Sequence, residues 1–232
     1  MKTEVYDGLQ PYGEILERQR ALFEVMVAEK RANGKVREEH LIMVEHTPVI
    51  TLGKHAKTEN LLFSVESLQK RGIEVFRIER GGDVTFHGPG QLVVYPLIDL
   101  EAYHLGIKKY IELLEEAVIR TIGEYGIIGE RVEGATGVWI GKDTPAERKI
   151  CAIGVKCCRY VTMHGLALNV NTDLSAFTLI NPCGFIDKGV TSICRETGGA
   201  VDLREVAGRL QFHLLSLLHN ISERKMQRDS NP

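Results

Sequence analysis

The chain has 232 residues, which suits one large domain, and 44% of them are hydrophobic, enough to bury a sizeable core. Lysine and arginine number 29 against 31 aspartates and glutamates, which argues against general binding to nucleic acid or a membrane surface. No apolar run approaches the roughly 18 residues of a membrane span, and the N-terminus lacks a secretory signal. Five cysteines without a C-x-x-C pair favour free thiols in a cytoplasmic protein.

Apolar spacing predicts helices and strands mixed along the first half of the chain. Residues 12–27 show the three- and four-residue spacing of a helix, with Gly34 beyond its end. A brief helix is expected from about Val65, with Ser64 as its N-cap and Gly72 as its stop. Short apolar runs predict strands at residues 41–44, 49–52, 73–78 and 92–98.

The second half continues the mixture. A long helix is predicted over residues 110–125, the segment 171–191 is expected to be irregular, and a last helix begins near Asp202 and gives way to a frayed tail after Ser222. Further strands are predicted at residues 137–140, 149–157 and 161–170. Because strands and helices do not alternate strictly, we predict an α/β or α+β fold. Its sheet is mixed and largely antiparallel, it is flanked by helices, and one catalytic domain spans residues 1–232.

Several familiar motifs are missing. Gly88-Pro89-Gly90 lacks the third glycine of a dinucleotide fingerprint, and Gly141-Lys142 precedes Asp143 where a P-loop needs Ser or Thr. There is no Gly-x-Ser-x-Gly elbow of a serine hydrolase. The five cysteines do not have the spacing of a tetrahedral metal site, so no metal is expected.

One cysteine stands out as a candidate nucleophile. The run Asn181-Pro182-Cys183-Gly184 fixes the backbone before the thiol and frees it afterwards, so this turn can present the sulfur to a cleft. A turn cysteine can also be inert. Cys151, Cys157 and Cys158 are better interpreted as small buried hydrophobes.

A nucleophilic thiol needs a neighbouring cation to lower its pKa from about 8.5. Lys149 at the start of a strand is one candidate, and His87 and His164, both beside glycines, are two more. A solvated lysine and structural histidines remain open alternatives. The segment 80–91 contains four glycines, whose backbone can bind an anion or a carbonyl oxygen or can simply form a tight connection between strands. The segment 165–167 can line an apolar slot or pack in the core.

Four motifs together resemble the lipoyl(octanoyl) transferase family over roughly residues 40–195. They are Arg80-Gly-Gly-x-x-Thr-x-His87-x-x-Gly90-Gln91, Lys149-Ile-x-Ala-Ile-Gly154, His164-Gly-Leu-Ala-Leu-Asn169 and Pro182-Cys183-Gly184. The resemblance implies the fold of the biotin and lipoate protein ligase catalytic domain. It also implies transfer of an octanoyl group from acyl carrier protein to a lysine of lipoyl domains in 2-oxoacid dehydrogenase complexes and of the glycine cleavage H protein. It implies no cofactor, since the substrate arrives on the phosphopantetheine of the carrier protein.

The resemblance also assigns roles to residues of this chain. Cys183 matches the residue that forms the acyl-thioester, and Lys149 matches the one that lowers the thiol's pKa and acts as general acid and base. The residues that match substrate-binding positions are Arg80, Gly81, Gly82, Asp83, Val84, Thr85, Phe86, His87, Ala152, Ile153, Gly154, Gly165, Leu166 and Ala167. Two features depart from the family: Cys151 stands where a smaller residue is commoner, and the pair Cys157-Cys158 is unusual.

These roles are chemically consistent. Exchange of one thioester for another is nearly balanced in energy, and the amide formed in the second step favours transfer. The attacking amine must be neutral although free lysine has a pKa of about 10.4, and Lys149 can take its proton if its own pKa is depressed. Because acyl carrier proteins are acidic, we expect a basic patch near the cleft, for which the candidates are Arg80, Arg148, Lys149, Lys156 and Arg159.

Three other functions remain open on the sequence alone. An ATP-dependent lipoate or biotin protein ligase of the same fold would use Lys149 for an acyl-adenylate but would not need Cys183. A catalytically idle module would bind acyl groups without turnover. A thioesterase would let water replace the lysine in the second step.

Overall fold

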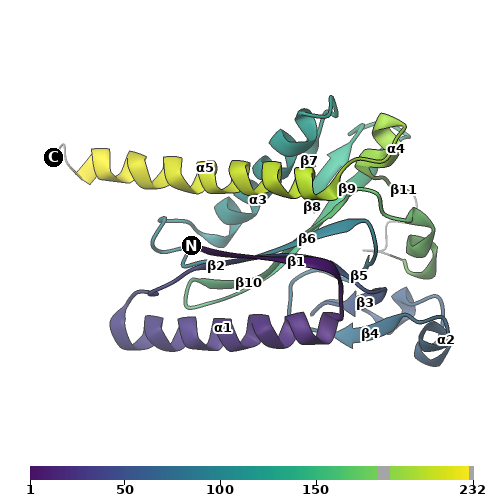
Figure 1. Ribbon diagram of the computed structural model, residues 1–232, viewed down its shortest axis with the longest axis horizontal. Coiled ribbons are helices and arrows are strands. Elements are labelled where there is room, and N and C mark those ends of the chain that lie inside the picture. Colours follow the sequence, from purple (N-terminus) through teal and green to yellow (C-terminus); the bar gives the residue numbers. More distant parts are fainter. Residues whose placement is uncertain (182–188, 230–232) are drawn as a thin grey trace.

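The computed structural model describes residues 1–181 and 189–229. A mixed sheet of eight strands among these residues forms the centre of the fold (Figure 1). In spatial order the strands are β1 (Lys2–Gln10), β2 (His40–His46), β6 (Gln91–Leu97), β10 (Val161–Asn169), β9 (Arg148–Cys158), β8 (Ala135–Ile140) and β7 (Glu130–Val132), with β11 (Gly189–Val190) beside β9. Within the described strands of this eight-stranded sheet, only β1 with β2 and β11 with β9 pair in parallel, so the sheet is largely antiparallel, as predicted.

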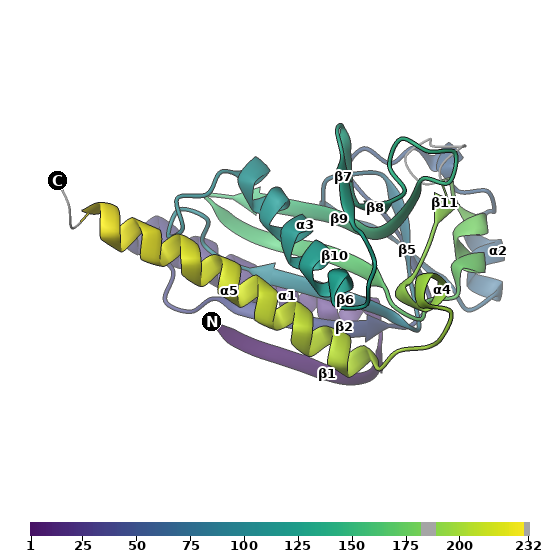
Figure 2. The same cartoon turned by 90° about the horizontal axis from the view of Figure 1, so that it is seen from above.

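Helices cover both faces of this sheet. The helix α1 (Tyr12–Asn33) lies on one face, and α3 (Ile107–Gly123) and α5 (Leu203–Asp229) lie together on the other (Figures 1 and 2). Apolar side chains from α1, β2, β6 and β10 form one core, and those from α3, α5 and the opposite strand faces form a second. Gly34 ends α1 in the left-handed conformation, at φ 71°, as its place in the sequence predicts.

A smaller sheet lies beyond one end of the main sheet. Its strands are β4 (Glu74–Arg77), β3 (Val49–Leu52) and β5 (Val84–His87). The helix α2 (Val65–Lys70) lies near it (Figure 1), and the 3-10 helix η2 (Leu174–Leu179) contacts β5. A second 3-10 helix, η1, spans Thr58–Asn60. Ser64 caps α2 by accepting a hydrogen bond from the Ser67 N–H, as predicted. A third apolar core under this sheet fixes its place.

Some elements differ from the prediction. The strand β1 lacks the apolar alternation of a buried strand because it lies at the sheet edge with mostly exposed side chains. The strands β5, β7 and β11 and the short helix α4 (Ile193–Thr197) were not predicted either. The expected frayed tail after Ser222 is wrong: α5 continues to Asp229, through a run rich in strong helix formers such as Glu, Arg, Lys, Met and Gln.

Within residues 1–181 and 189–229, no helix combines the length and the apolar character needed to cross a membrane. That the whole chain forms one catalytic domain stays a prediction.

Candidate active site

A cavity of about 350 Å³ lies where the main sheet meets the smaller one. Its described walls come from α1, β5, β6, β8, β9, β10, β11 and η2. Two segments proposed from the sequence, 152–154 and 165–167, line it together with most of segment 80–87. The cavity therefore brings together motifs that are more than 60 residues apart in the chain.

The strands β9 and β10 provide one wall of the cavity through small side chains. They pair antiparallel, so that Ala152 lies opposite Ala167 and Gly154 lies opposite Gly165. The alternate residues Ile153 and Leu166, also opposite each other, border the cavity too but belong to the core on the side of α3 and α5. Small residues on one face therefore leave room for a ligand, while large residues on the other face hold the sheet to its helices.

Close backbone approach requires glycine at two of these positions. A Cβ on Gly165 would lie 2.1 Å from the Val94 carbonyl oxygen of the neighbouring strand β6. A Cβ on Gly154 would lie 2.8 Å from the Gly81 carbonyl oxygen. Because real contacts of this kind are longer, any larger residue forces the strands or the 80–82 turn to shift.

Arg80 holds the glycine-rich segment against the smaller sheet. The side chain is buried, and its Nη2 donates to the carbonyl and hydroxyl oxygens of Thr51 at 2.8 and 2.9 Å. Gly82 has a φ of 85°, which favours glycine. Arg80, Gly82, Asp83, Val84, Thr85 and His87 line the cavity.

Gly81 and Phe86 do not line the cavity as far as the described residues define it. The Gly81 N–H donates to the Val155 carbonyl oxygen, and Phe86 packs against Phe177 in the core of the smaller sheet. For both residues the structure shows a supporting position behind the cavity wall. Their part in substrate binding stays a prediction, as it does for the residues that line the cavity.

Lys149 lines the same cavity at the start of β9. Its Nζ donates to the Thr136 carbonyl oxygen at 3.1 Å and lies 4.5 Å from the centre of the Trp139 ring. Val190 of β11 lies beside Lys149, and the Thr191 N–H donates to the Lys149 carbonyl oxygen at 2.9 Å. The amine is therefore held at the cavity wall by β8.

The predicted nucleophile, Cys183, lies outside the described residues. On one side of the undescribed segment, the Asn181 N–H donates to the Asn60 carbonyl oxygen. On the other side, Gly189 lines the cavity and pairs with Arg148. The proximity of Cys183 to Lys149 stays a prediction.

The family of this chain follows from its similarity to known proteins. Residues 12–215 match the model of the lipoyl protein ligase A/B catalytic domain. The chain belongs to this family. An octanoyltransferase of Bacteroides fragilis is 52% identical over 219 residues, which cover 94% of this chain and 99% of that protein. An octanoyltransferase of Bacteroides thetaiotaomicron is 52% identical over 228 residues, which cover 98% and 99%.

These relatives confirm the resemblance to octanoyltransferases and the prediction of an acyltransferase enzyme.

Among solved structures, a bi-partite lipoate protein ligase from Thermoplasma acidophilum has a TM-score of 0.68 at 19% identity, covering 94% of this chain and 84% of that one. A lipoate-protein ligase A bound with ATP has a TM-score of 0.65 at 18% identity, covering 94% and 86%. These two structures confirm the predicted fold of the ligase catalytic domain.

The two candidate histidines of this family member are buried and neutral. Burial lowers the pKa of both His87 and His164 to about 3. The Nδ1 of His87 lies 2.8 Å from Gln91 Oε1, whereas the ring nitrogens of His164 have no hydrogen-bond partner among the described residues. A neutral imidazole cannot provide the positive charge that lowers a thiol's pKa. The two histidines are therefore excluded as the source of that charge, and the role of Lys149 stays a prediction.

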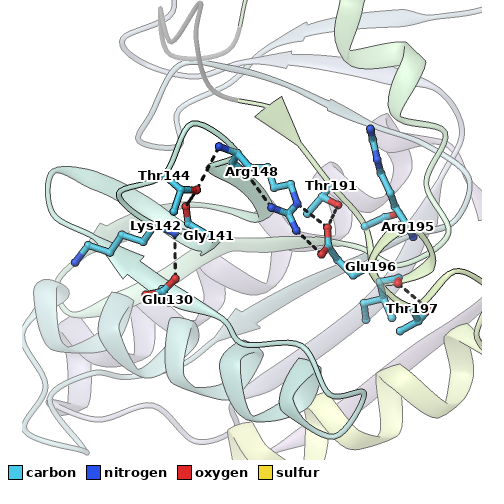
Figure 3. Close-up of polar contacts among 12 residues, drawn as sticks. Glu130, Gly141, Lys142, Thr144, Arg148, Thr191, Arg195, Glu196 and Thr197 are labelled. Carbon is cyan, nitrogen blue, oxygen red and sulfur yellow. Dashed lines mark hydrogen bonds and ion pairs between the residues drawn. The ribbon is translucent and has the colours of Figure 1, made fainter.

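The expected basic patch is wrong for Arg148, because an acidic residue pairs with it. Figure 3 shows the Arg148 side chain directed at Glu196 of α4. The Arg148 Nε and Nη2 lie 2.7 and 2.5 Å from the Glu196 carboxylate, which also accepts a hydrogen bond from Thr191 Oγ1 at 2.5 Å. This pair joins β9 to α4 and neutralises the charge on Arg148.

The other candidates for the expected basic patch are buried, paired with an acidic residue or distant from Arg148. Lys156 lies 3.3 Å from Glu79, and Arg80 is buried. Arg159 follows the last residue of β9 whereas Arg148 is its first, and a strand of this length separates the two by roughly 30 Å. The five residues therefore do not form one surface.

Several cavity residues were missed by sequence reasoning. Gln91 and Asn169 are the last residues of the first and third motifs, so the motifs themselves contain that signal. The others, from separate elements, are Tyr12, Val93, Tyr95, Gly134, Ala135, Thr136, Trp139, Phe177, Gly189 and Val190. Only tertiary packing brings these residues to the site. Among residues 1–181 and 189–229, no cluster of three or more His, Cys, Asp or Glu is arranged to bind a metal.

Proposed function

We propose that this chain transfers an octanoyl group from acyl carrier protein to a lysine of a lipoyl domain, through a thioester on Cys183. The observation that carries the proposal is the cavity wall of small residues on β9 and β10, with Lys149 lining the same cavity. The acceptors are the lipoyl domains of 2-oxoacid dehydrogenase complexes and the glycine cleavage H protein. The relatives named octanoyltransferase support the choice of acyl group.

The cavity is suited to an unbranched acyl chain. Ala152 and Ala167 on the adjacent, paired strands β9 and β10 leave a slot in the wall, and Gly154 and Gly165 extend it along the strands. Burying the six methylene groups of an octanoyl chain contributes about 5 kcal/mol, at ~0.8 kcal/mol each. Binding of the chain can thus align the thioester without a charged contact to it.

In the first step, the Cys183 thiolate attacks the carbonyl carbon of the donor thioester. A new carbon–sulfur bond forms, the bond to phosphopantetheine breaks, and the leaving thiolate takes up a proton. The Lys149 ammonium favours the attacking thiolate by its charge and can then give up a proton to the leaving sulfur. The Thr136 carbonyl oxygen and the Trp139 ring both favour the charged form of this amine.

In the second step, the acceptor lysine attacks the acyl-enzyme as a neutral amine. A carbon–nitrogen bond forms, the Cys183 thiolate leaves, and the proton lost from the amine passes to Lys149. Lys149 is then protonated again beside a thiolate, ready for the next donor.

The donor is already activated as a thioester, so the proposal requires no ATP, metal or other cofactor. A reactive thiol also suits a reducing compartment, and we propose a cytoplasmic site of action.

The test is transfer between octanoyl-acyl carrier protein and a lipoyl domain, followed by mass spectrometry of the domain with and without ATP. The proposal predicts octanoylation without ATP and a loss of about a hundredfold or more in Lys149→Ala. Lys156→Ala, which removes a lysine from the same strand outside the cavity, serves as the control and should retain wild-type activity. Transfer that occurs only with free octanoate and ATP would instead establish a ligase.

A further inference from the structure

The helix α3 contributes one buried charged side chain to the middle of the protein. Glu115 is 6% exposed and lies on the helix face that otherwise packs apolar residues against the sheet. Burying a carboxylate costs several kcal/mol unless its partners compensate. None of the steps proposed above uses this group.

Glu115 binds the peptide that also binds Lys149. Its Oε1 accepts a hydrogen bond from the Gly137 N–H at 3.0 Å, and Lys149 Nζ donates to the Thr136 carbonyl oxygen at 3.1 Å. This carbonyl and this N–H belong to a single peptide unit. In a trans peptide they point in opposite directions, so the carboxylate and the amine hold the unit from its two sides.

Local geometry leaves this peptide little freedom. Gly137 has a φ of 124°, and a Cβ there would lie 2.4 Å from the Cys151 carbonyl oxygen. The pairing of β8 with β9 shifts register between Val138 and Trp139, directly after this point. The Glu115 carboxylate thus replaces a strand partner for the Gly137 N–H.

We propose that Glu115 is a positioning residue for the acyl transfer: through the 136–137 peptide it orients the carbonyl that holds the Lys149 ammonium. The negative carboxylate polarises the peptide, which strengthens the hydrogen bond from the amine to Thr136. This inference rests on the proposed role of Lys149.

Several charged or titratable groups lie near Glu115, the 136–137 peptide and Lys149. Arg131 of β7 lies 3.2 Å from Glu115 Oε2, and Glu112 lies one turn earlier on the same helix. On β9, Arg148 is paired with Glu196, and Cys151 is a buried thiol whose pKa is raised by that burial. Burial also raises the pKa of Glu115, while the Gly137 N–H and Arg131 oppose that rise.

The same helix provides a matched control. Glu116 lies 2.7 Å from Arg131 and also pairs with Arg120, but no hydrogen bond joins it to the 136–137 peptide among the described residues. Glu115→Gln and Glu116→Gln both remove one negative charge beside Arg131. Only Glu115→Gln removes the charge that polarises the Lys149 site, and its amide oxygen can still accept from Gly137.

The experiment measures kcat and KM for octanoyl transfer, and the pH dependence of iodoacetamide alkylation of the peptide that contains Cys183, in both variants. For Glu115→Gln we expect kcat to fall about tenfold or more with KM little changed. We also expect the alkylation midpoint to move up by about half a pH unit or more, because a less firmly held ammonium stabilises the thiolate less. Glu116→Gln should match the wild type in both measurements.

Melting temperatures and a third variant separate the outcomes. If Glu115→Gln lowers the melting temperature but leaves kcat and the alkylation midpoint unchanged, Glu115 is only structural and the inference is overturned. If the alkylation midpoint is unchanged in Lys149→Ala as well as in Glu115→Gln, the failure lies in the proposed pairing of Lys149 with Cys183, on which the inference rests.

Discussion

Mild acid should destabilise this fold because three histidines are buried around the cavity in their neutral form. Burial lowers the pKa of His46 to about 4 and those of His87 and His164 to about 3. In the unfolded chain each has a pKa of about 6.5. The stability that comes from these depressed pKa values is fully present above pH 6.5 and is lost as the pH falls towards 3, because only the unfolded chain takes up the protons.

The size of the effect follows from linkage. Between pH 6 and pH 5 each unfolded histidine is mostly protonated, so each neutral folded histidine lowers the free energy of unfolding by about 1.2 kcal/mol, or about 3.5 kcal/mol for three. Burial also lowers the pKa values of His40 and His213, which adds to the loss. Burial raises the pKa values of Glu39 and Glu115, which opposes it. Because these contributions partly cancel, the sharper test compares the loss of unfolding free energy between a histidine variant and the wild type.

The perturbation is His164→Asn, since asparagine tolerates the φ of 63° found at this position. Urea unfolding at pH 6 and pH 5, followed by fluorescence of the single tryptophan, gives the free energy at each pH. The variant should lose about 1.2 kcal/mol less than the wild type over this interval. Val93→Ala, a cavity residue that does not titrate, is the control and should show the wild-type pH dependence. An equal loss in His164→Asn and wild type would refute a neutral imidazole in the folded state.

Three further predictions concern the cavity and its supports. Gly165→Ala should lower the free energy of unfolding by several kcal/mol, because its Cβ would lie 2.1 Å from the Val94 carbonyl oxygen, and a near-native melting temperature would contradict this. Ala167→Leu should fill the slot and raise KM for the octanoyl donor about tenfold with little change in melting temperature, whereas unchanged KM would exclude this wall from the acyl site. Glu196→Gln should lower the free energy of unfolding in urea by about 1–2 kcal/mol, because it weakens the contact with Arg148, and no loss would show that this pair contributes nothing.

Local signals predicted the elements that have one buried face and a clear boundary. The helix α1 shows apolar spacing and ends at Gly34, and α2 begins at Ser64. The edge strand β1 has mostly exposed side chains and depends on pairing with β2, which no local pattern encodes. The strand β5 lies inside the glycine-rich segment, where a turn composition conceals it.

The sequence motifs also marked part of the cavity wall. The segments 152–154 and 165–167 come together because β9 and β10 pair residue for residue, and the motifs marked both. The prediction of a basic patch was wrong because the sequence shows positive charges but not their ion-pair partners. Glu196, the partner of Arg148, is 48 residues away in the chain. The buried contact of Glu115 with the Gly137 N–H was not predicted for a related reason: in the sequence Glu115 is one more polar residue on an amphipathic helix.

The most direct test of the account is the intact mass of the protein after mixing with octanoyl-acyl carrier protein in the absence of an acceptor. The wild type should gain the mass of one octanoyl group, the adduct should vanish on treatment with hydroxylamine, and Cys183→Ala should form none. An adduct of equal amount on Cys183→Ala, or no adduct on a wild type that still octanoylates a lipoyl domain, would contradict transfer through this cysteine.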